Sequence, residues 1–180
     1  MGLFRKALSP HQTALAMIGA RAGDRVLLAG RPDPVVVAEL ARVTGLSGQT
    51  LIAVDTSSKA RYDAAAADAG ILVESVDVVA GTARLPGTGG DHDVVVLHFD
   101  LAPLDDTARQ LVVADAFAAL RPGGRVIVLE GRPQTGWFGS RPATVEAGVV
   151  LGVLEQAGGL AVRALGMAAD VWYFEARKPR

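Results

Sequence analysis

The stretch at residues 25–34 constrains the fold of this chain more than any other. Its first half contains the uninterrupted apolar run Val26-Leu27-Leu28-Ala29, which predicts a buried strand, and Gly30 predicts a turn where that strand ends. Asp33 and Pro34 then predict the start of a helix, because aspartate caps helices and proline suits the first helical position. The segment is therefore expected to run from strand through a tight turn into a helix.

A second apolar run, Thr50 to Val54, comes about twenty residues later and ends on Asp55. A strand, turn and helix followed by a second strand that ends in an acid is a layout that holds nucleosides. The helix N-terminus faces the ligand, and the carboxylate binds the ribose hydroxyls. Two simpler roles stay open, since Asp55 could only cap the next helix and Gly30 could serve only the turn.

The same alternation of strand and helix continues along the chain. Further strands are expected at residues 71–79, 93–98 and 125–130, and helices at residues 10–20, 34–44, 58–69, 105–120 and 143–157. The helix at 105–120 is expected to bury Ala108, Leu111, Val112 and Ala119. The strands near 25, 93 and 125 are almost continuous Val, Leu and Ile runs, as expected for parallel strands covered on both faces.

The end of the chain departs from this rhythm. Strands are expected at residues 160–167 and 171–177, and the three-residue link between them requires an antiparallel pair, because a parallel return needs a dozen or more residues. The sequence thus predicts an α/β fold: a doubly wound, Rossmann-like seven-stranded sheet, mostly parallel, with a C-terminal antiparallel hairpin. No linker interrupts residues 1–180, so we expect a single domain.

Composition excludes several classes of partner. The net charge of -1 gives no attraction to nucleic acid or to an acidic membrane surface, and no apolar run is long enough to span a membrane. Residues 1–8 are too short and too charged for a secretory signal, and the absence of cysteine fits a cytoplasmic location. His11, His92 and His98 are not spaced as a metal site. A homo-oligomer stays open.

Three features together resemble the class I S-adenosylmethionine-dependent methyltransferases: the order of elements, the turn and strand Leu120-Arg121-Pro122-Gly123-Gly124-Arg125-Val126-Ile127-Val128, and the terminal hairpin. The chain looks most like the small-molecule branch that includes quinone-biosynthesis enzymes, whose loop after the third strand resembles Gly81-Thr82-Ala83-Arg84-Leu85-Pro86. The resemblance spans about residues 9–178 and implies S-adenosylmethionine as cofactor.

The resemblance also implies roles for individual residues. Gly30 matches the first glycine of the cofactor loop, Asp55 matches the acid that binds the ribose, and Thr56 lies near the adenosine. Thr82 and Ala83 match positions that contact the adenine edge, with Thr82 in place of the usual acid.

The end of the fourth strand is where cofactor and substrate meet in this family, which implies roles for Leu97 and His98. His98 is a candidate general base with Asp100 orienting it, since imidazole titrates near pH ~6.5. The alternative is a histidine at the end of a strand whose hydrogen bonds are satisfied and which has no catalytic role. Farther along, Trp137-Phe138 could cover a substrate or pack onto the domain.

The cofactor loop departs from the family pattern at three positions. Leu28 replaces an acid that would help hold the cofactor's amino group, and Pro32 and Pro34 replace glycines. Proline has no N–H to donate, and a capping Asp33 would place a carboxylate where the cofactor's own carboxylate docks. Arg31 could compensate in part. We therefore expect weak binding of S-adenosylmethionine, or none.

Three functions are compatible with these residues to different degrees. The first is a methyltransferase that acts on a small molecule, because no appended domain or basic patch suggests a larger substrate. The second is a non-catalytic relative that has lost cofactor binding and serves as a binding or partner module. The third, a nicotinamide-dependent oxidoreductase, needs G-x-G-x-x-G after the first strand, and residues 30–35 lack both later glycines.

Overall fold

The structure is a computed structural model that describes residues 9–77, 85, 89–131 and 144–180. The strands are β1 (Arg25–Gly30), β2 (Gln49–Val54), β3 (Glu74–Asp77), β4 (His92–His98), β5 (Leu120–Gly131), β6 (Leu160–Ala168) and β7 (Val171–Arg177). The helices are α1 (Pro10–Ile18), α2 (Pro34–Thr44), α3 (Thr56–Ala69), α4 (Asp106–Ala119) and α5 (Ala147–Gln156).

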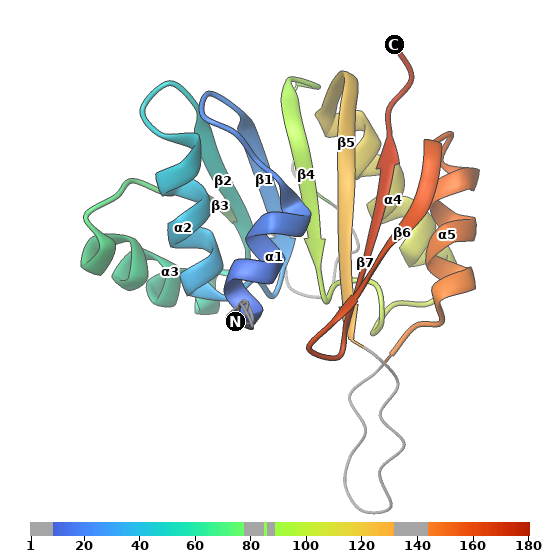
Figure 1. Cartoon of the computed structure of the whole chain (residues 1–180), viewed down its shortest axis with the longest axis horizontal. Coiled ribbons are helices and arrows are strands. Elements are labelled where there is room, and N and C mark those ends of the chain that lie inside the picture. Colours follow the sequence, from blue (N-terminus) through green and yellow to red (C-terminus); the bar gives the residue numbers. More distant parts are fainter. Residues whose placement is uncertain (1–8, 78–84, 86–88, 132–143) are drawn as a thin grey trace, which may run out of the picture.

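All seven strands join one sheet in the order β3-β2-β1-β4-β5-β7-β6 (Figure 1). The first five strands pair in parallel, whereas β7 runs antiparallel to both β5 and β6. The predicted mostly parallel sheet with a terminal antiparallel hairpin is confirmed. The hairpin does not simply extend the edge, because β7 lies between β5 and β6.

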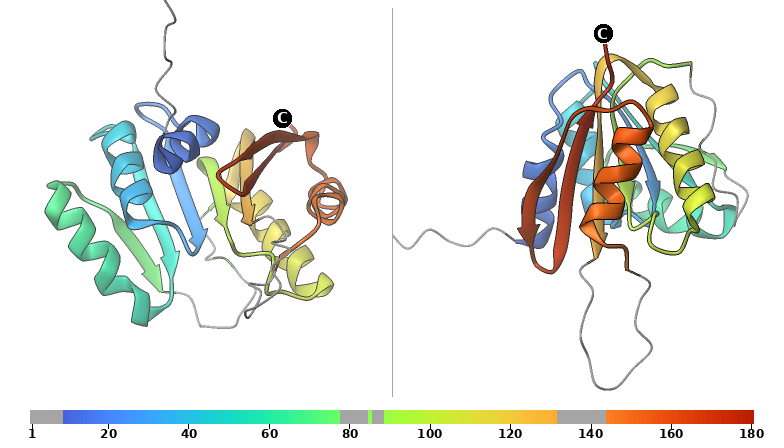
Figure 2. Two further views of the ribbon diagram at one scale, coloured as in Figure 1. Left: turned by 60° about the horizontal axis from the view of Figure 1, so that its bottom comes forward. Right: turned by 90° about the vertical axis from the view of Figure 1, so that its right-hand side faces the viewer.

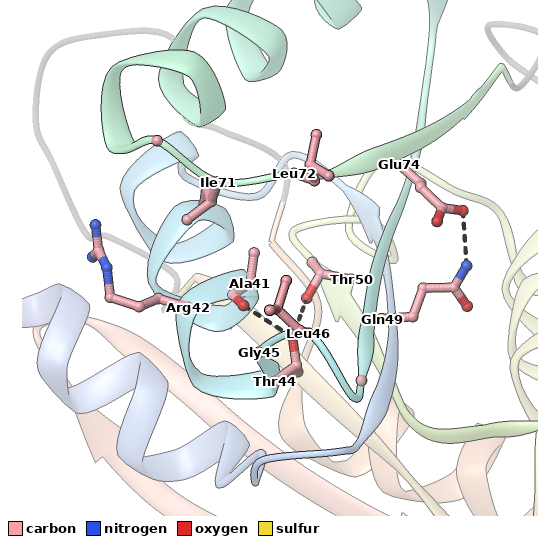
Figure 3. A pocket seen from close by; sticks show the side chains of 12 residues that line it. Ala41, Arg42, Thr44, Gly45, Leu46, Gln49, Thr50, Ile71, Leu72 and Glu74 are labelled. Atoms are coloured by element: carbon pink, nitrogen blue, oxygen red, sulfur yellow. Dashed lines mark hydrogen bonds between the residues drawn. The ribbon is translucent and has the colours of Figure 1, made fainter.

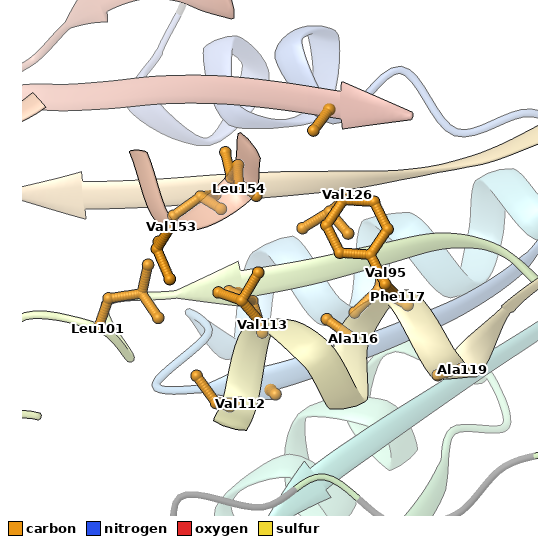
Figure 4. Packing of buried hydrophobic residues seen from close by; sticks show 14 of the residues in the cluster. Val95, Leu101, Val112, Val113, Ala116, Phe117, Ala119, Val126, Val153 and Leu154 are labelled. Atoms are coloured by element: carbon orange, nitrogen blue, oxygen red, sulfur yellow. The ribbon is translucent and has the colours of Figure 1, made fainter. Parts of the chain in front are cut away.

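Helices cover both faces of the sheet (Figure 2). On one face α1, α2 and Tyr62 of α3 bury one apolar cluster against β1, β2 and β4, and on the other face α4 and α5 bury a second. In the second cluster Phe117 of α4 and Leu154 of α5 pack over the sheet near Val95 and Val126 (Figure 4). This double coverage explains the continuous apolar runs of the central strands.

Capping residues set the predicted starts of several helices. Ser9 and Gln12 form a reciprocal capping box, in which the Ser9 hydroxyl accepts the Gln12 N–H at 3.2 Å and the Gln12 side chain accepts the Ser9 N–H at 3.0 Å. Asp33 caps α2 and Asp105 caps α4 through their carboxylates, which accept the N–H groups of Val35 and Ala108. None of the helices among the described residues is long and apolar enough to cross a membrane.

Some element boundaries differ from the prediction. Helix α3 begins at Thr56 rather than 58, because Asp55 caps it. Strand β3 begins at Glu74 rather than Ile71, whose N–H is bonded to the Ala66 carbonyl at the end of α3. Strand β5 already begins at Leu120, so the expected turn at 121–124 becomes an irregular strand opposite β4.

Two helices also differ from the prediction in detail. Helix α5 begins at Ala147 instead of 143, after its N-cap residue Glu146. The burial expected for Leu111 in α4 is wrong, since its side chain is 44% exposed. The burial predicted for Val112 and Ala119 is confirmed, and the buried face also includes Val113, Ala116 and Phe117.

Candidate functional site

The carboxyl ends of β1, β2, β4 and β5 lie together at one edge of the sheet, the lower edge in Figure 1. The strand order reverses between β1 and β4, and open α/β sheets bind ligands at this kind of switch point. Gly30 lies opposite His98 in the sheet register, and Ala29 lies opposite Ala53, two residues before Asp55. The fold therefore brings the predicted residues Gly30, Asp55, Leu97 and His98 to one edge.

Of the other predicted site residues, one is described by the structure and the rest are not. Thr56 is the exposed first residue of α3. Thr82, Ala83 and the pair Trp137-Phe138 lie outside the described residues.

Gly30 has a structural reason to be glycine. Its φ is +88°, and a Cβ at this position would lie 2.4 Å from the His98 carbonyl oxygen and 2.9 Å from Cβ of Asp100. The next residue, Arg31, donates its N–H to the same His98 carbonyl at 2.7 Å. The close approach of β1 and β4 thus accounts for this glycine without any ligand.

The loop before α2 is bonded internally. The Asp33 carboxylate accepts the Val35 N–H at 2.8 Å, and Pro34 has no N–H to offer. The Tyr62 hydroxyl of α3 donates to the Pro32 carbonyl at 2.8 Å and fixes the loop from the other side. The first turn of α2 therefore has fewer donors for an anion than a glycine loop would have.

Asp55 serves as the N-cap of α3. Its carboxylate accepts the backbone N–H of Ser58 at 3.0 Å and the hydroxyl groups of Ser57 and Ser58. These hydrogen bonds lower the pKa of Asp55, with the two serine side chains as the main causes, so the residue is an anion at neutral pH. The capping role is established, and ribose binding stays a prediction because a carboxylate can accept further bonds.

A serine at position 55 separates these two roles. Asp55→Ser keeps an efficient N-cap, so we expect the melting temperature to stay within ~1 °C, whereas Asp55→Ala should lower it by about 2–4 °C. If Asp55 also binds a ribose, both variants should lose affinity for adenosine-containing ligands. Thermal unfolding and calorimetry on the two variants measure these effects, and unchanged nucleoside affinity in both would leave Asp55 as a cap alone.

His98 is almost completely buried, with 6% of its surface exposed. Burial lowers the pKa of His98 to about 4, although the Asp33 charge acts in the opposite direction, so the imidazole is neutral at pH 7. Its Nδ1 has no hydrogen-bond partner in the described part of the chain, and its ring packs edge-on against Phe99 at 4.5 Å. A role for His98 as general base stays a prediction, and no hydrogen bond joins it to Asp100 within the described residues.

Sequence reasoning missed Glu130 at the end of β5. This side chain is only 1% exposed, and its Oε1 accepts the Leu101 N–H at 2.8 Å. Burial, together with the nearby Asp100 charge, raises the pKa of Glu130 to about 7. A signal was present, because Glu130 follows an apolar strand as Asp55 does, but its place beside the turn after β4 depends on the fold.

A separate hollow of about 520 Å³ lies at the opposite edge, between the ends of α2 and α3 (Figure 3). Its polar side chains satisfy one another: the hydroxyls of Thr44 and Thr50 lie 3.1 Å apart, and Gln49 donates to Glu74 at 2.8 Å. It is therefore a weaker candidate than the carboxyl edge. In the ranges that the structure describes, no three acidic or histidine side chains could hold a metal ion.

Comparisons with known proteins give partial sequence similarity and a clear match of fold. No family model matches the chain. The ubiquinone/menaquinone biosynthesis C-methyltransferase UbiE of Vibrio vulnificus is 31% identical over 113 residues, which cover 62% of this chain and 43% of the relative. The match thus spans less than half the length of that relative.

Among solved structures, a SAM-dependent methyltransferase from Aquifex aeolicus has a TM-score of 0.76 at 16% identity, covering 93% of this chain and 89% of the other. The structure of PigF with SAH has a TM-score of 0.65 at 15% identity, covering 86% and 56% of the two chains. The chain therefore has the fold of the SAM-dependent methyltransferases, and part of its sequence resembles the quinone-biosynthesis C-methyltransferases.

Proposed function

We propose that this chain is a methyltransferase that uses S-adenosylmethionine and acts on a small molecule. The observation that carries the proposal is the shared sheet edge, where the Gly30 turn and Asp55 end neighbouring strands. The similarity of fold to a solved SAM-dependent methyltransferase supports the same function. Similarity to UbiE favours a small acceptor over a macromolecule.

Some parts of the cofactor have a suitable partner among the described residues at this edge, and others do not. Asp55 is an anion beside the place where a ribose would lie, and Arg31 is an exposed cation suited to a carboxylate. The contacts proposed for Thr56, Thr82 and Ala83 with the adenosine rest on the resemblance. The bound cofactor would supply a methyl group on a sulfonium ion, and the chain would bind and orient the reacting partners beside Leu97 and His98.

We expect the affinity for S-adenosylmethionine to be weaker than low micromolar, because Pro34 and Asp33 remove donors at the start of α2. Titration calorimetry with S-adenosylmethionine and S-adenosylhomocysteine tests this. Low-micromolar affinity for either would contradict the expected weakness. No binding of either at millimolar concentration would overturn the methyltransferase and favour the alternative, a non-catalytic relative. That alternative is favoured by one observation: Asp33 and Asp55 both serve as helix caps, a role that requires no cofactor.

Removing the charge of Asp33 should strengthen binding. Asp33→Ser retains a capping hydroxyl for the Val35 N–H but removes a negative charge from the helix N-terminus, where the cofactor's carboxylate would dock. We expect about three- to tenfold tighter binding of S-adenosylhomocysteine, since helix-end charge effects reach about 1 kcal/mol. Calorimetry measures the change, and equal affinity for variant and wild type would place the ligand's carboxylate elsewhere.

A further inference from the structure

The turn that follows β4 places an acid directly beside the end of β1. A Cβ on Gly30 would lie 2.9 Å from Cβ of Asp100, so the base of the Asp100 side chain lies directly beside the Gly30 turn. Arg31 follows that turn, and its positive charge acts on Asp100. Burial nevertheless raises the pKa of Asp100, because few water molecules can stabilise the carboxylate there.

The attraction between these two charges is long-range, because no hydrogen bond or ion pair joins the two side chains within the described residues. Within the described ranges, the Asp100 carboxylate makes no hydrogen bond or ion pair, and Arg31 uses only its backbone N–H. Charges that lose water are normally paired in folded proteins. A partly buried carboxylate near an exposed guanidinium suits a ligand that carries one ammonium and one carboxylate group, because each end of the ligand can then pair with one of the two charges.

The turn itself is firmly held. The Leu101 N–H donates to Oε1 of Glu130 at 2.8 Å, its carbonyl accepts Nε of Arg109 at 2.9 Å, and its side chain is fully buried. On the other side of Asp100, Phe99 has a left-handed φ of +53° and donates its N–H to Leu129 at 2.8 Å. Such a conformation persists only where the surroundings enforce it, and active sites and ligand clamps are among the places where it clusters.

Two further polar atoms near this turn are buried without a hydrogen-bond partner. Oε2 of Glu130 and Nδ1 of His98 have no hydrogen-bond partner within the part of the chain that the structure describes. The two side chains are 1% and 6% exposed. Buried polar groups are hydrogen-bonded in most native structures, so these two atoms are available to a ligand that binds beside the turn.

We propose that Asp100 binds the ammonium group, and Arg31 the carboxylate, of an α-amino-acid moiety at the carboxyl edge of the sheet. This inference rests on the proposed function, in which the moiety belongs to the cofactor. The family pattern places an acid for the ammonium at Leu28, but that apolar side chain is fully buried in the core. In this proposal the acid that binds the ammonium lies on the turn after β4 instead of on the neighbouring strand β1.

Two ligands that differ only in the amino-acid part test the proposal. S-adenosylhomocysteine carries the moiety, and 5′-methylthioadenosine lacks it. Asp100→Asn should weaken S-adenosylhomocysteine about 10- to 100-fold, the effect of losing a bond to a charged group, and leave 5′-methylthioadenosine within about twofold. Asp68→Asn, which neutralises an exposed acid at the far end of α3, should change neither. Calorimetry with wild type and both variants gives the ratios.

The same measurements distinguish a failure of the role of Asp100 from a failure of the methyltransferase proposal. Equal weakening of both ligands by Asp100→Asn, or no weakening of S-adenosylhomocysteine, would overturn the role of Asp100 and leave the methyltransferase proposal standing. Wild-type protein that binds neither ligand would overturn both proposals. If Asp100→Asn does not fold, Arg31→Gln replaces it, because the Arg31 side chain is exposed and has no partner among the described residues. Compared with wild type, that variant should bind S-adenosylhomocysteine more weakly and 5′-methylthioadenosine equally well. An equal loss of affinity for both ligands, or no loss for S-adenosylhomocysteine, would overturn the proposal.

Discussion

Replacing Gly30 by alanine is expected to lower the free energy of unfolding by about 2–5 kcal/mol. The backbone at φ +88° strains any side chain, at a cost of roughly 1–2 kcal/mol. The new Cβ would also lie 2.4 Å from the His98 carbonyl oxygen, a rigid backbone atom, and such overpacking costs about 1–3 kcal/mol more. Urea unfolding followed by circular dichroism measures the change.

Gly70 provides the matched control for this substitution. It also has a positive φ, +65°, but a Cβ there would meet nothing within 4 Å. Gly70→Ala should therefore cost only about 1–2 kcal/mol. Equal losses for the two variants would mean that conformation alone, and not the contact between β1 and β4, requires glycine at position 30.

Removing the ionisable group of Glu130 should change how stability depends on pH. Folding raises the pKa of this carboxyl from 4.5 to about 7, mainly through burial, so the folded chain holds a proton that the unfolded chain releases. Wild-type protein should lose up to about 3 kcal/mol from this group as the pH rises from ~4.5 to ~7.5. Glu130→Gln keeps an acceptor for the Leu101 N–H and avoids that loss. Its stability relative to wild type should therefore rise with pH.

His98 provides a control of opposite sign. Burial lowers its pKa from 6.5 to about 4, so below pH ~6.5 the unfolded chain binds a proton that the folded chain does not. Stability from this group is lost as the pH falls, and His98→Leu should gain relative to wild type toward acid. Urea unfolding at several pH values compares the two variants. If both variants shifted in the same direction, the opposed titrations assigned to Glu130 and His98 would be wrong.

Local chemistry made much of the fold predictable. The helix starts at Ser9, Asp33 and Asp105 depend on caps that lie within a few residues of the groups they bind. The position of Phe117 in the core was not predictable in this way, because it depends on how α4 lies across the sheet. Likewise, residues 71–73 look like a strand in isolation, but the end of α3 draws Ile71 into its own hydrogen bonds.

In the candidate site, too, residues with a local sequence signal were predictable, whereas residues whose role depends on distant contacts were not. Gly30, Asp55 and His98 were found because each ends a recognisable strand, and parallel strands bring their carboxyl ends together. Glu130 was missed because its role depends on a bond to Leu101, 29 positions away in the sequence. The contact between Gly30 and Asp100 likewise requires β1 and β4 to be neighbours, which the order of elements along the chain does not reveal without the resemblance.

The place of β7 between β5 and β6 has a consequence during synthesis. Because β7 is made after β6 but pairs with β5, the nascent chain exposes the apolar edge of β5 until residues 171–177 emerge. An open edge rich in valine and isoleucine is a template for pairing with other chains. Protein truncated before Val171 should therefore aggregate rather than accumulate as a partly folded monomer.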